Sequence, residues 1–384
     1  MICGIYLGEW LLWNWWRLRY EPRRPTDDSW VRAHSMAEIG YGFVWPRITI
    51  SSDGFRSVIA SEQSSEERSF RFTGSIPQLV AWTEVEKAID DLSSVVSGRL
   101  AHHGISGANF ERLLEDLSAE RSDPEVGRLR RLEAEMGFDP DELSEGYVRG
   151  ILSEGTKFGS GSISEIGATA KRQNGLPKFA LPLASIHPLA HQYGVDAKFE
   201  IPFSAINLVQ AHWGKLSASE IGVKLAQLVR SQHVQHDGPI TDIQLAELCG
   251  ISSGTFGATN KGNDTIAYSL RESSGKDRMV FRSRWQVGRR FEAARVFSDR
   301  ALAGDDTLAV ATGTKTYRQK AQRSFAAEFL APINSVVEFC DGDFSEAVLQ
   351  EAADYYCVSG MLIESLLKNN GYLPRTTADF MDAA

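Results

Sequence analysis

Apolar and polar residues alternate between residues 39 and 72, as they do in half-buried β-strands, and Asp53-Gly54 forms a turn signal between two of these runs. Four tryptophans precede them between residues 10 and 16. Large aromatic side chains usually pack in a core, and the alternative is a partner-binding surface. The pattern predicts a small β-rich N-terminal domain over residues 1–75.

The apolar period changes to that of a helix after residue 76. Between Leu79 and Val96 the apolar residues recur at intervals of three and four. Further along, Asp123-Pro124 and Asp139-Pro140 place an acidic residue and a proline where helices commonly begin. Residues 76–175 are therefore predicted to form a helical module.

The C-terminal part, residues 176–384, mixes helical and strand-like patterns. An amphipathic helix is expected over 217–233 and a short one over 241–250, followed by two strands joined by a turn. The expected strands are 265–270 and 279–282, and the later helices are 287–302, 316–339, 345–356 and 360–368. The whole chain is thus predicted to be α+β and mostly helical.

Composition narrows the class of protein. The chain has 384 residues, 42% of them hydrophobic, and a net charge of -9, which indicates a soluble globular protein of two or three domains. The net negative charge argues against a protein whose whole surface binds phosphate. The cysteines are scattered and form no CxxC pair, and the apolar N-terminus is too short and too polar for a membrane span. We expect a cytoplasmic protein that does not enter the membrane.

The most informative segment is the block FAAEFLAP at residues 325–332, which is followed by Val358-Ser359 and by NNGYL at residues 369–373. As a set, these elements resemble the C-terminal half of ImmA/IrrE-type zinc metallopeptidases. The resemblance covers roughly residues 217–373, which is under half of the chain. It implies a zincin-like fold for the C-terminal domain, and it places the family's third metal ligand at Glu328.

The same family carries an HExxH motif on an upstream helix, where two histidines hold zinc and the glutamate polarises water. Residues 289–299 (RRFEAARVFSD) align with the family pattern RRFTLAHELGH. The two histidines then correspond to Arg295 and Asp299, and the glutamate corresponds to Val296. Arginine does not coordinate zinc and valine is not a general base. The resemblance therefore implies a degenerate, pseudo-metallopeptidase member with no catalytic residues and no expected cofactor.

A salt-bridged cluster is the expected replacement for the metal. Arg295 and Asp299 are four residues apart on one helix, and the arginine fork could also reach Glu328. The alternative is a surviving divalent metal site in which Asp299 and Glu328 are joined by His187 or His191. Such oxygen ligands suit magnesium or manganese better than zinc.

Positive charge is concentrated between residues 276 and 300, which contain eight basic and three acidic residues. One interpretation is a solvated face or one paired with acidic residues. The other is a patch for an anionic ligand or nucleic acid, formed by Arg282, Arg284, Arg289 and Arg290.

These observations lead to three functional hypotheses. The first is a catalytically degenerate ImmA/IrrE-like protein that regulates or senses by binding a protein partner, in a setting such as stress response or the control of phages and mobile elements. The second is a metal-dependent hydrolase, a peptidase with a non-standard ligand set. The third is a DNA-binding regulator that uses the basic patch.

Overall fold

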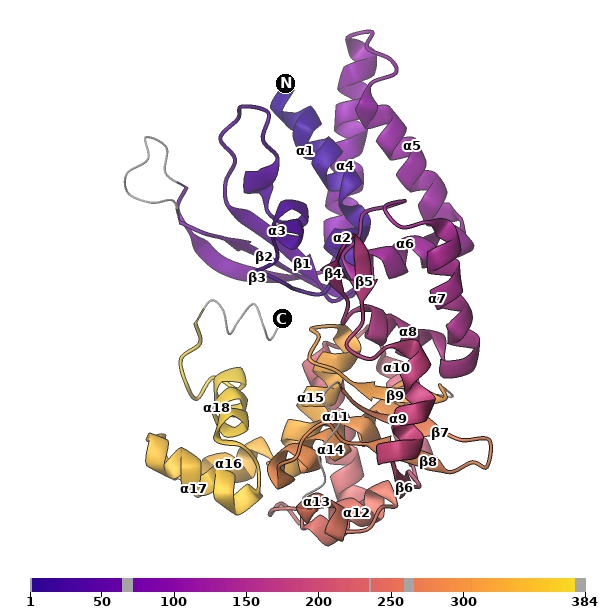
Figure 1. The fold of residues 1–384 in the computed structure, drawn as a ribbon. Coiled ribbons are helices and arrows are strands. Elements are labelled where there is room, and N and C mark those ends of the chain that lie inside the picture. The colour runs from indigo at the N-terminus through magenta and orange to yellow at the C-terminus, as the bar shows by residue number, and fades with distance from the viewer. Residues whose placement is uncertain (1, 64–71, 235, 259–265, 305, 377–384) are drawn as a thin grey trace.

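The computed structural model describes residues 2–63, 72–234, 236–258, 266–304 and 306–376. The chain is α+β and mostly helical, as its sequence pattern predicts, and its strands form small antiparallel sheets (Figure 1). Among these residues, no helix is both long and apolar enough to cross a lipid bilayer.

The N-terminal part begins with helices instead of strands, which corrects the β-rich prediction for its first residues. The helices are α1 (Ile2–Trp13), α2 (Trp15–Tyr20) and α3 (Asp28–His34), followed by a 3-10 turn at Met36–Glu38. Helix α1 is apolar on nearly every side, so it carries no amphipathic period in the sequence, and such helices are buried in a protein core. Helix α2 has six residues, too few to show a period. The tryptophan-rich stretch is thus largely core, and Trp13 is its exposed member.

The predicted hairpin is confirmed. Strands β1 (Ile48–Ser52) and β2 (Arg56–Ser61) pair antiparallel across the turn at Asp53-Gly54, and β3 (Ser75–Ala81) pairs with β2. Most of the last strand-like run of the prediction, at residues 70–72, lies outside the described residues. The sheet packs against α1, α2 and α4 (Trp82–His102), and one hydrophobic cluster crosses residue 75 without interruption.

The region after β3 is largely helical, with two corrections to the prediction. Leu79 belongs to β3, so the first helix begins at Trp82. Asp139-Pro140 starts no helix, because it lies in the turn between a helix that ends at Met136 and one that begins at Glu145.

Asp123 accepts hydrogen bonds from the first turn of its helix, Pro124 occupies that turn, and Gly137 ends the helix with a positive φ of 82°. The elements after α4 are α5 (Asn109–Ser122), α6 (Pro124–Met136), α7 (Glu145–Phe158), α8 (Ser160–Gly167), β4 (Lys171–Gln173) and β5 (Leu176–Lys178).

The C-terminal part contains a sheet in the order β6-β8-β7-β9, with helices on both faces. Side chains alternate between the faces: on β9, Leu308 and Val310 contact the cluster that includes α8, whereas Ala309 and Ala311 contact the cluster around α14. The elements of the sheet and of these two faces are α9 (Ile186–Tyr193), β6 (Val195–Ala197), α10 (Phe203–His212), α11 (Ala218–His233), α12 (Asp242–Cys249), α13 (Gly254–Gly257), β7 (Ala267–Arg271), β8 (Asp277–Val280), α14 (Gln286–Leu302), β9 (Leu308–Ala311) and α15 (Tyr317–Leu330).

The last helices are α16 (Ile333–Cys340), α17 (Glu346–Tyr356) and α18 (Gly360–Asn369). The single helix predicted over 316–339 is divided into α15 and α16, because Pro332 has no N–H to continue the helix and excludes helical backbone before it. The other helices of this region agree with their predicted bounds to within one or two residues. Residue 265 of the first predicted strand lies outside the described residues.

Candidate functional site

The helix α14 carries two of the three predicted site residues and packs against α15, which carries the third (Figure 1). Asp299 of α14 is completely buried. Its carboxylate accepts from Arg318 Nε at 2.6 Å and Nη2 at 2.7 Å, from Gln322 Nε2 at 2.6 Å, and from the Val310 backbone N–H at 2.8 Å. Both carboxylate oxygens are therefore used inside the protein.

Arg318, from the first turn of α15, is the cation that pairs with Asp299. Burial would lower the pKa of the Arg318 guanidinium, but the charge of Asp299 and its hydrogen bonds outweigh burial and raise that pKa. The fork geometry satisfies both oxygens at once, which makes this the strongest kind of ion pair in proteins. The i,i+4 pair predicted between Arg295 and Asp299 is replaced by a pair between two facing helices.

Arg295 lies nearby with different partners. Its Nη2 donates to the Thr312 carbonyl at 2.7 Å and to Gln319 Oε1 at 2.6 Å. No carboxylate lies within ion-pair distance of it, and its Nε has no hydrogen-bond partner among the described residues. Burial, together with the charge of Arg323, lowers the pKa of Arg295 to about 9, so the side chain is a buried cation at neutral pH.

Glu328 does not join the other two residues. It accepts from Gln227 Nε2 at 3.3 Å and from the Ile333 backbone N–H at 3.2 Å, which places its charge at the start of α16. Asp299 contacts α15 at Arg318 and Gln322, and Glu328 follows Gln322 by six residues, about 9 Å along a helix. The predicted contact between the Arg295 guanidinium and Glu328 is not formed. Glu328 lies on a later turn of α15 than the residues that contact Arg295 and Asp299.

The alternative metal site is not assembled either. Within the described parts of the chain, no three His, Cys, Asp or Glu side chains lie close enough together to hold a metal ion. His187 lies against the ring of Phe158 on the opposite side of the sheet, with centroids 5.6 Å apart. Asp299, Glu328 and the two histidines of α9 therefore do not converge.

The polar network around Asp299 extends to the helical module. Arg318 Nη2 donates to Ser162 Oγ at 3.2 Å, and Ser162 donates to Asp306 at 3.0 Å. Glu165, also on α8, accepts from Thr316 Oγ1 at 2.7 Å. Burial raises the pKa of Glu165 to about 7, although the Arg318 charge opposes this. The network joins α8 to the start of α15.

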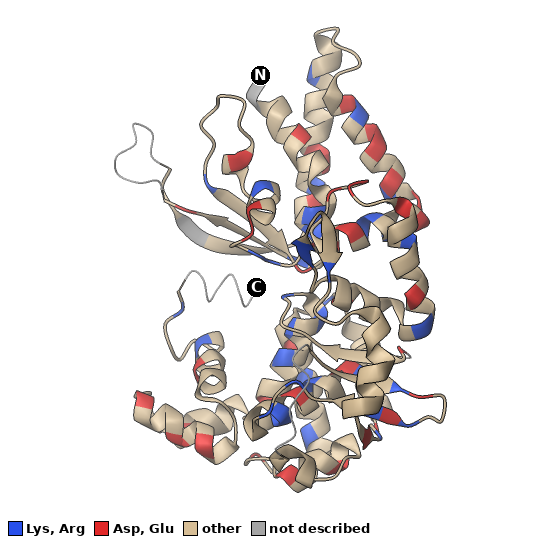
Figure 2. Ribbon diagram, viewed as in Figure 1, with Lys and Arg blue, Asp and Glu red and all other residues tan. Residues whose placement is uncertain are grey.

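The predicted basic patch does not form one surface. Arg282 and Arg284 are exposed, whereas Arg289 and Arg290 are buried. Arg289 donates to the carbonyls of Ser283 at 2.9 Å and Thr255 at 2.7 Å, and Arg290 donates to that of Ile240 at 2.5 Å. Figure 2 shows basic positions along α14 and α15, and acidic positions along α5 and α17. Much of the positive charge in residues 276–300 is therefore internal, because arginine forks satisfy loop carbonyls.

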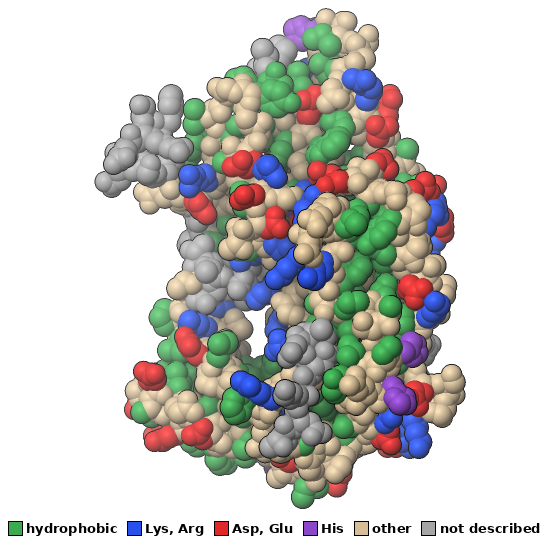
Figure 3. Space-filling view, in the orientation of Figure 1, with side chains coloured by type: hydrophobic (Ala, Val, Ile, Leu, Met, Phe, Trp, Pro, Cys, Tyr) green, Lys and Arg blue, Asp and Glu red, His purple; other side chains and the backbone are tan. Residues whose placement is uncertain are grey.

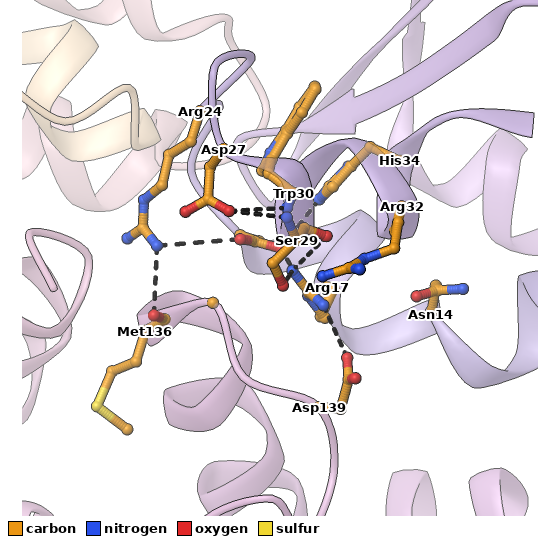
Figure 4. A network of polar contacts seen from close by, with 12 residues as sticks. Asn14, Arg17, Arg24, Asp27, Ser29, Trp30, Arg32, His34, Met136 and Asp139 are labelled. Carbon is orange, nitrogen blue, oxygen red and sulfur yellow. Dashed lines mark hydrogen bonds and ion pairs between the residues drawn. The ribbon is translucent and has the colours of Figure 1, made fainter. Parts of the chain in front are cut away.

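A second buried polar network links the N-terminal helices to α6 (Figure 4). Arg17 donates to Glu21 at 2.7 Å and to Asp139 at 2.8 Å. His34 Nδ1 lies 2.7 Å from the Ile50 carbonyl and its Nε2 lies 3.2 Å from Glu21. The ring of His34 thus bridges strand β1 and the carboxylate of Glu21.

Glu21 lies between Arg17 and His34. Burial alone would raise its pKa, but the hydrogen bond from His34 and the charge of Arg17 outweigh burial and lower the pKa to about 2. Arg24 extends the network by donating to the Met136 carbonyl at 3.2 Å, beside the αL turn at Gly137 (Figure 4). These contacts join α2 and α3 to α6 and to the turn that follows it.

Comparison with known protein families, curated proteins and solved structures finds no match for this chain. The site is therefore defined by its own geometry. Sequence reasoning identified Asp299 but missed its partners Arg318 and Gln322. Their spacing of four residues places them on one face of a helix, which was the available signal. Sequence reasoning also missed a cavity beside α1.

Proposed function

We propose that this chain is a catalytically degenerate ImmA/IrrE-like protein with a zincin-like C-terminal domain, which regulates or senses by binding a protein partner in the cytoplasm. This regulation or sensing is proposed to take place in stress response or in the control of phages and mobile elements. The observation that carries this proposal is the Arg318–Asp299 ion pair. At a position where the family resemblance implies a metal ligand, a guanidinium already takes both oxygens of the carboxylate.

The neighbouring position supports the same proposal. Arg295 stands where the resemblance implies the first histidine, and its charge would repel a divalent cation. Val296 stands where a catalytic glutamate is implied and has no group that can accept a proton from water. The order of elements from α11 to α16 (three helices, a β-hairpin, a helix, a strand and two helices) supports the zincin-like fold as the scaffold.

The test is metal content measured together with proteolysis. The full chain is purified without chelator, and its zinc, magnesium and manganese are quantified by mass spectrometry. The same preparation, with zinc added, is incubated with unfolded casein. Asp299→Asn and Glu328→Ala are compared with Glu364→Gln, a matched control on the exposed side of α18.

We expect far less than one metal ion per chain in all four proteins and no cleavage of casein. Nearly one metal ion per chain that is lost in Asp299→Asn or Glu328→Ala, retained in Glu364→Gln and accompanied by zinc-dependent cleavage would overturn the proposal. That result would favour the metal-dependent hydrolase instead. Circular dichroism of each variant separates loss of metal from loss of fold.

The DNA-binding alternative receives less support from the geometry. Of its four arginines, Arg282 and Arg284 remain available on the surface, and Arg284 lies over the ring of Trp285 at 5.2 Å. Specific DNA-binding proteins combine many phosphate contacts, and two arginines supply few of them. Retention on DNA with a steep dependence on salt would revive this alternative.

A further inference from the structure

A cavity of about 360 Å³ lies in the N-terminal part, far along the chain from the candidate site. It lies between α1, the start of α5 and the segment that follows α3, and it is open to solvent. Figure 1 shows the loop between α3 and β1 rising beside α1. Small-molecule pockets in proteins commonly have volumes of about 300–1,000 Å³. The cavity is therefore large enough for a small ligand or a long side chain.

The walls of this cavity are unusually aromatic. Tyr6, Trp10, Trp13 and Tyr41 all line it. The rings of Tyr6 and Tyr41 stack with centroids 3.9 Å apart and planes 9° apart. Trp13 is 49% exposed and Tyr41 is 65% exposed, so aromatic surface remains accessible from solvent.

Two carboxylates complete the lining. Glu9 of α1 and Glu38 of the 3-10 turn face the cavity, and no Lys, Arg or His belongs to its lining. Within the part of the chain that the structure describes, neither glutamate forms an ion pair or a side-chain hydrogen bond. The cavity therefore combines π-faces with negative charge that the protein itself leaves uncompensated.

The aromatic rings of α2 lie under arginine side chains, unlike those of the cavity. Arg19 and Arg121 lie over Trp15 at 5.3 and 5.0 Å, and Arg131 lies over Tyr20 at 4.8 Å. These guanidinium groups are held by cation–π attraction in addition to their other contacts. No such cation lies over the four cavity rings among the described residues. The cavity rings thus lack the cations that lie over the rings of α2.

Tyr41 is held in a strained conformation. Its φ is 58°, in the left-handed region that bulky residues rarely adopt, and the flanking Gly40 and Gly42 have φ values of 74° and 76°. Strain of this kind clusters at ligand-binding sites. Here it holds an exposed tyrosine ring against Tyr6 at the mouth of the cavity.

We propose that this cavity, the aromatic-acidic pocket, binds an organic cation with an alkylated ammonium or a guanidinium head group. Aromatic faces attract such cations through their quadrupoles, and the carboxylates of Glu9 and Glu38 add charge attraction. The head group could belong to a free small molecule or to a lysine or arginine side chain of a protein. This site is independent of the proposed function, because none of its residues belongs to the C-terminal half.

The test is isothermal titration calorimetry of the full chain with three probes. Choline and N-acetyl-arginine amide carry the head groups, and 3,3-dimethylbutan-1-ol is the neutral shape mimic of choline. We expect choline or the arginine amide to bind at least about tenfold more tightly than the neutral alcohol, since cation–π attraction is lost with the charge.

Two variants locate the binding. Trp13→Leu removes an exposed ring, and Glu9→Gln combined with Glu38→Gln removes the charge while keeping the shape. Each should weaken binding of the better cation by about tenfold or more. Trp285→Leu is the matched control, because Trp285 is 65% exposed on the other half of the molecule, and it should leave the affinity unchanged.

Two sources of the head group are distinguished by a third step. The better head group is presented on a pentapeptide of otherwise small residues. Tighter binding of the peptide assigns the site to a protein side chain, whereas equal binding assigns it to a free small cation; both outcomes support the pocket. Affinities of both cations no higher than that of the neutral alcohol, full affinity in the variants, or no binding of either cation at 10 mM, roughly the weak limit for such sites, would overturn it.

Discussion

The Arg318–Asp299 ion pair is buried on both sides, with 7% and 0% of the side chains exposed. Removing one member leaves the other charged and without compensation, and such losses cost about 3–5 kcal/mol. We therefore expect Asp299→Asn to lower the free energy of unfolding by that amount, measured by urea denaturation. A loss below about 1 kcal/mol for Asp299→Asn would contradict this description.

The buried carboxyl of Glu165 makes stability depend on pH in the opposite sense from most carboxylates. Its pKa is about 7 in the folded chain against 4.5 for an ordinary glutamate. Between these values the folded state keeps a proton that the unfolded state has released, so stability falls as pH rises from about 4.5 to 7 and then levels off.

Glu165→Gln stays neutral at every pH and should therefore remove this dependence. The variant should gain more stability over the natural chain at pH 8 than at pH 5, by at most a few kcal/mol, since one pKa unit corresponds to about 1.4 kcal/mol. Thermal unfolding at both pH values measures the difference. Glu145→Gln is the control, because its side chain is 64% exposed, and a similar pH-dependent gain there would argue against Glu165 as the source.

At the scale of elements, the close contact of α11 with α15 fixes where Arg318 and Gln322 lie. Gly222 of α11 meets the backbone of α15: a Cβ there would overlap the Ala321 carbonyl and lie 2.8 Å from Phe325 N. Gly222→Ala should push the helices apart and destabilise by about 1–3 kcal/mol, less the gain in helix propensity.

Gly98 on α4 is the matched control for this substitution. It is also a helical glycine, but a Cβ there would have no neighbour within 4 Å. Gly98→Ala should stabilise by up to about 1 kcal/mol, because alanine favours the helix and nothing obstructs it. Urea denaturation of both variants gives the comparison, and equal effects would mean that α11 and α15 are not in tight contact.

Some of the elements could be predicted from the sequence, and others could not. Periodicity and caps place α11, α14, α17 and α18 within one or two residues, because those signals are local. The helix α1 escapes prediction because it lacks a polar face, and α2 escapes it because six residues are too few to show a period. The partner of Asp299 escapes it because several arginines are near in sequence, and only the crossing of α14 and α15 selects Arg318 over Arg295. Burial of Arg289 and Arg290 likewise depends on loops that come from elsewhere in the chain.

At the scale of the whole molecule, the β1–β2 turn connects the N-terminal sheet to the C-terminal half. Phe55 lies against Tyr317 and Trp213, with ring centroids 4.7 and 6.4 Å apart, and Asp53 pairs with Lys320 at 3.1 Å. Tyr317 and Lys320 flank Arg318 on α15. Figure 3 shows a hollow on this face between the two halves, with Lys and Arg side chains beside it. The turn therefore couples the sheet to the helix that holds the candidate site.

Phe55→Ala should loosen that connection without unfolding either half. The ring is 37% exposed, so its loss should cost less than the 3–5 kcal/mol of a fully buried phenylalanine, about 1–2 kcal/mol. Hydrogen exchange read by mass spectrometry should become faster in residues 48–61 and at the start of α15, and stay unchanged in α17 and α18. Val44→Ala, at an exposed position before β1, should change neither region. Unchanged exchange at α15 in Phe55→Ala would show that the turn rests on the C-terminal half without stabilising it.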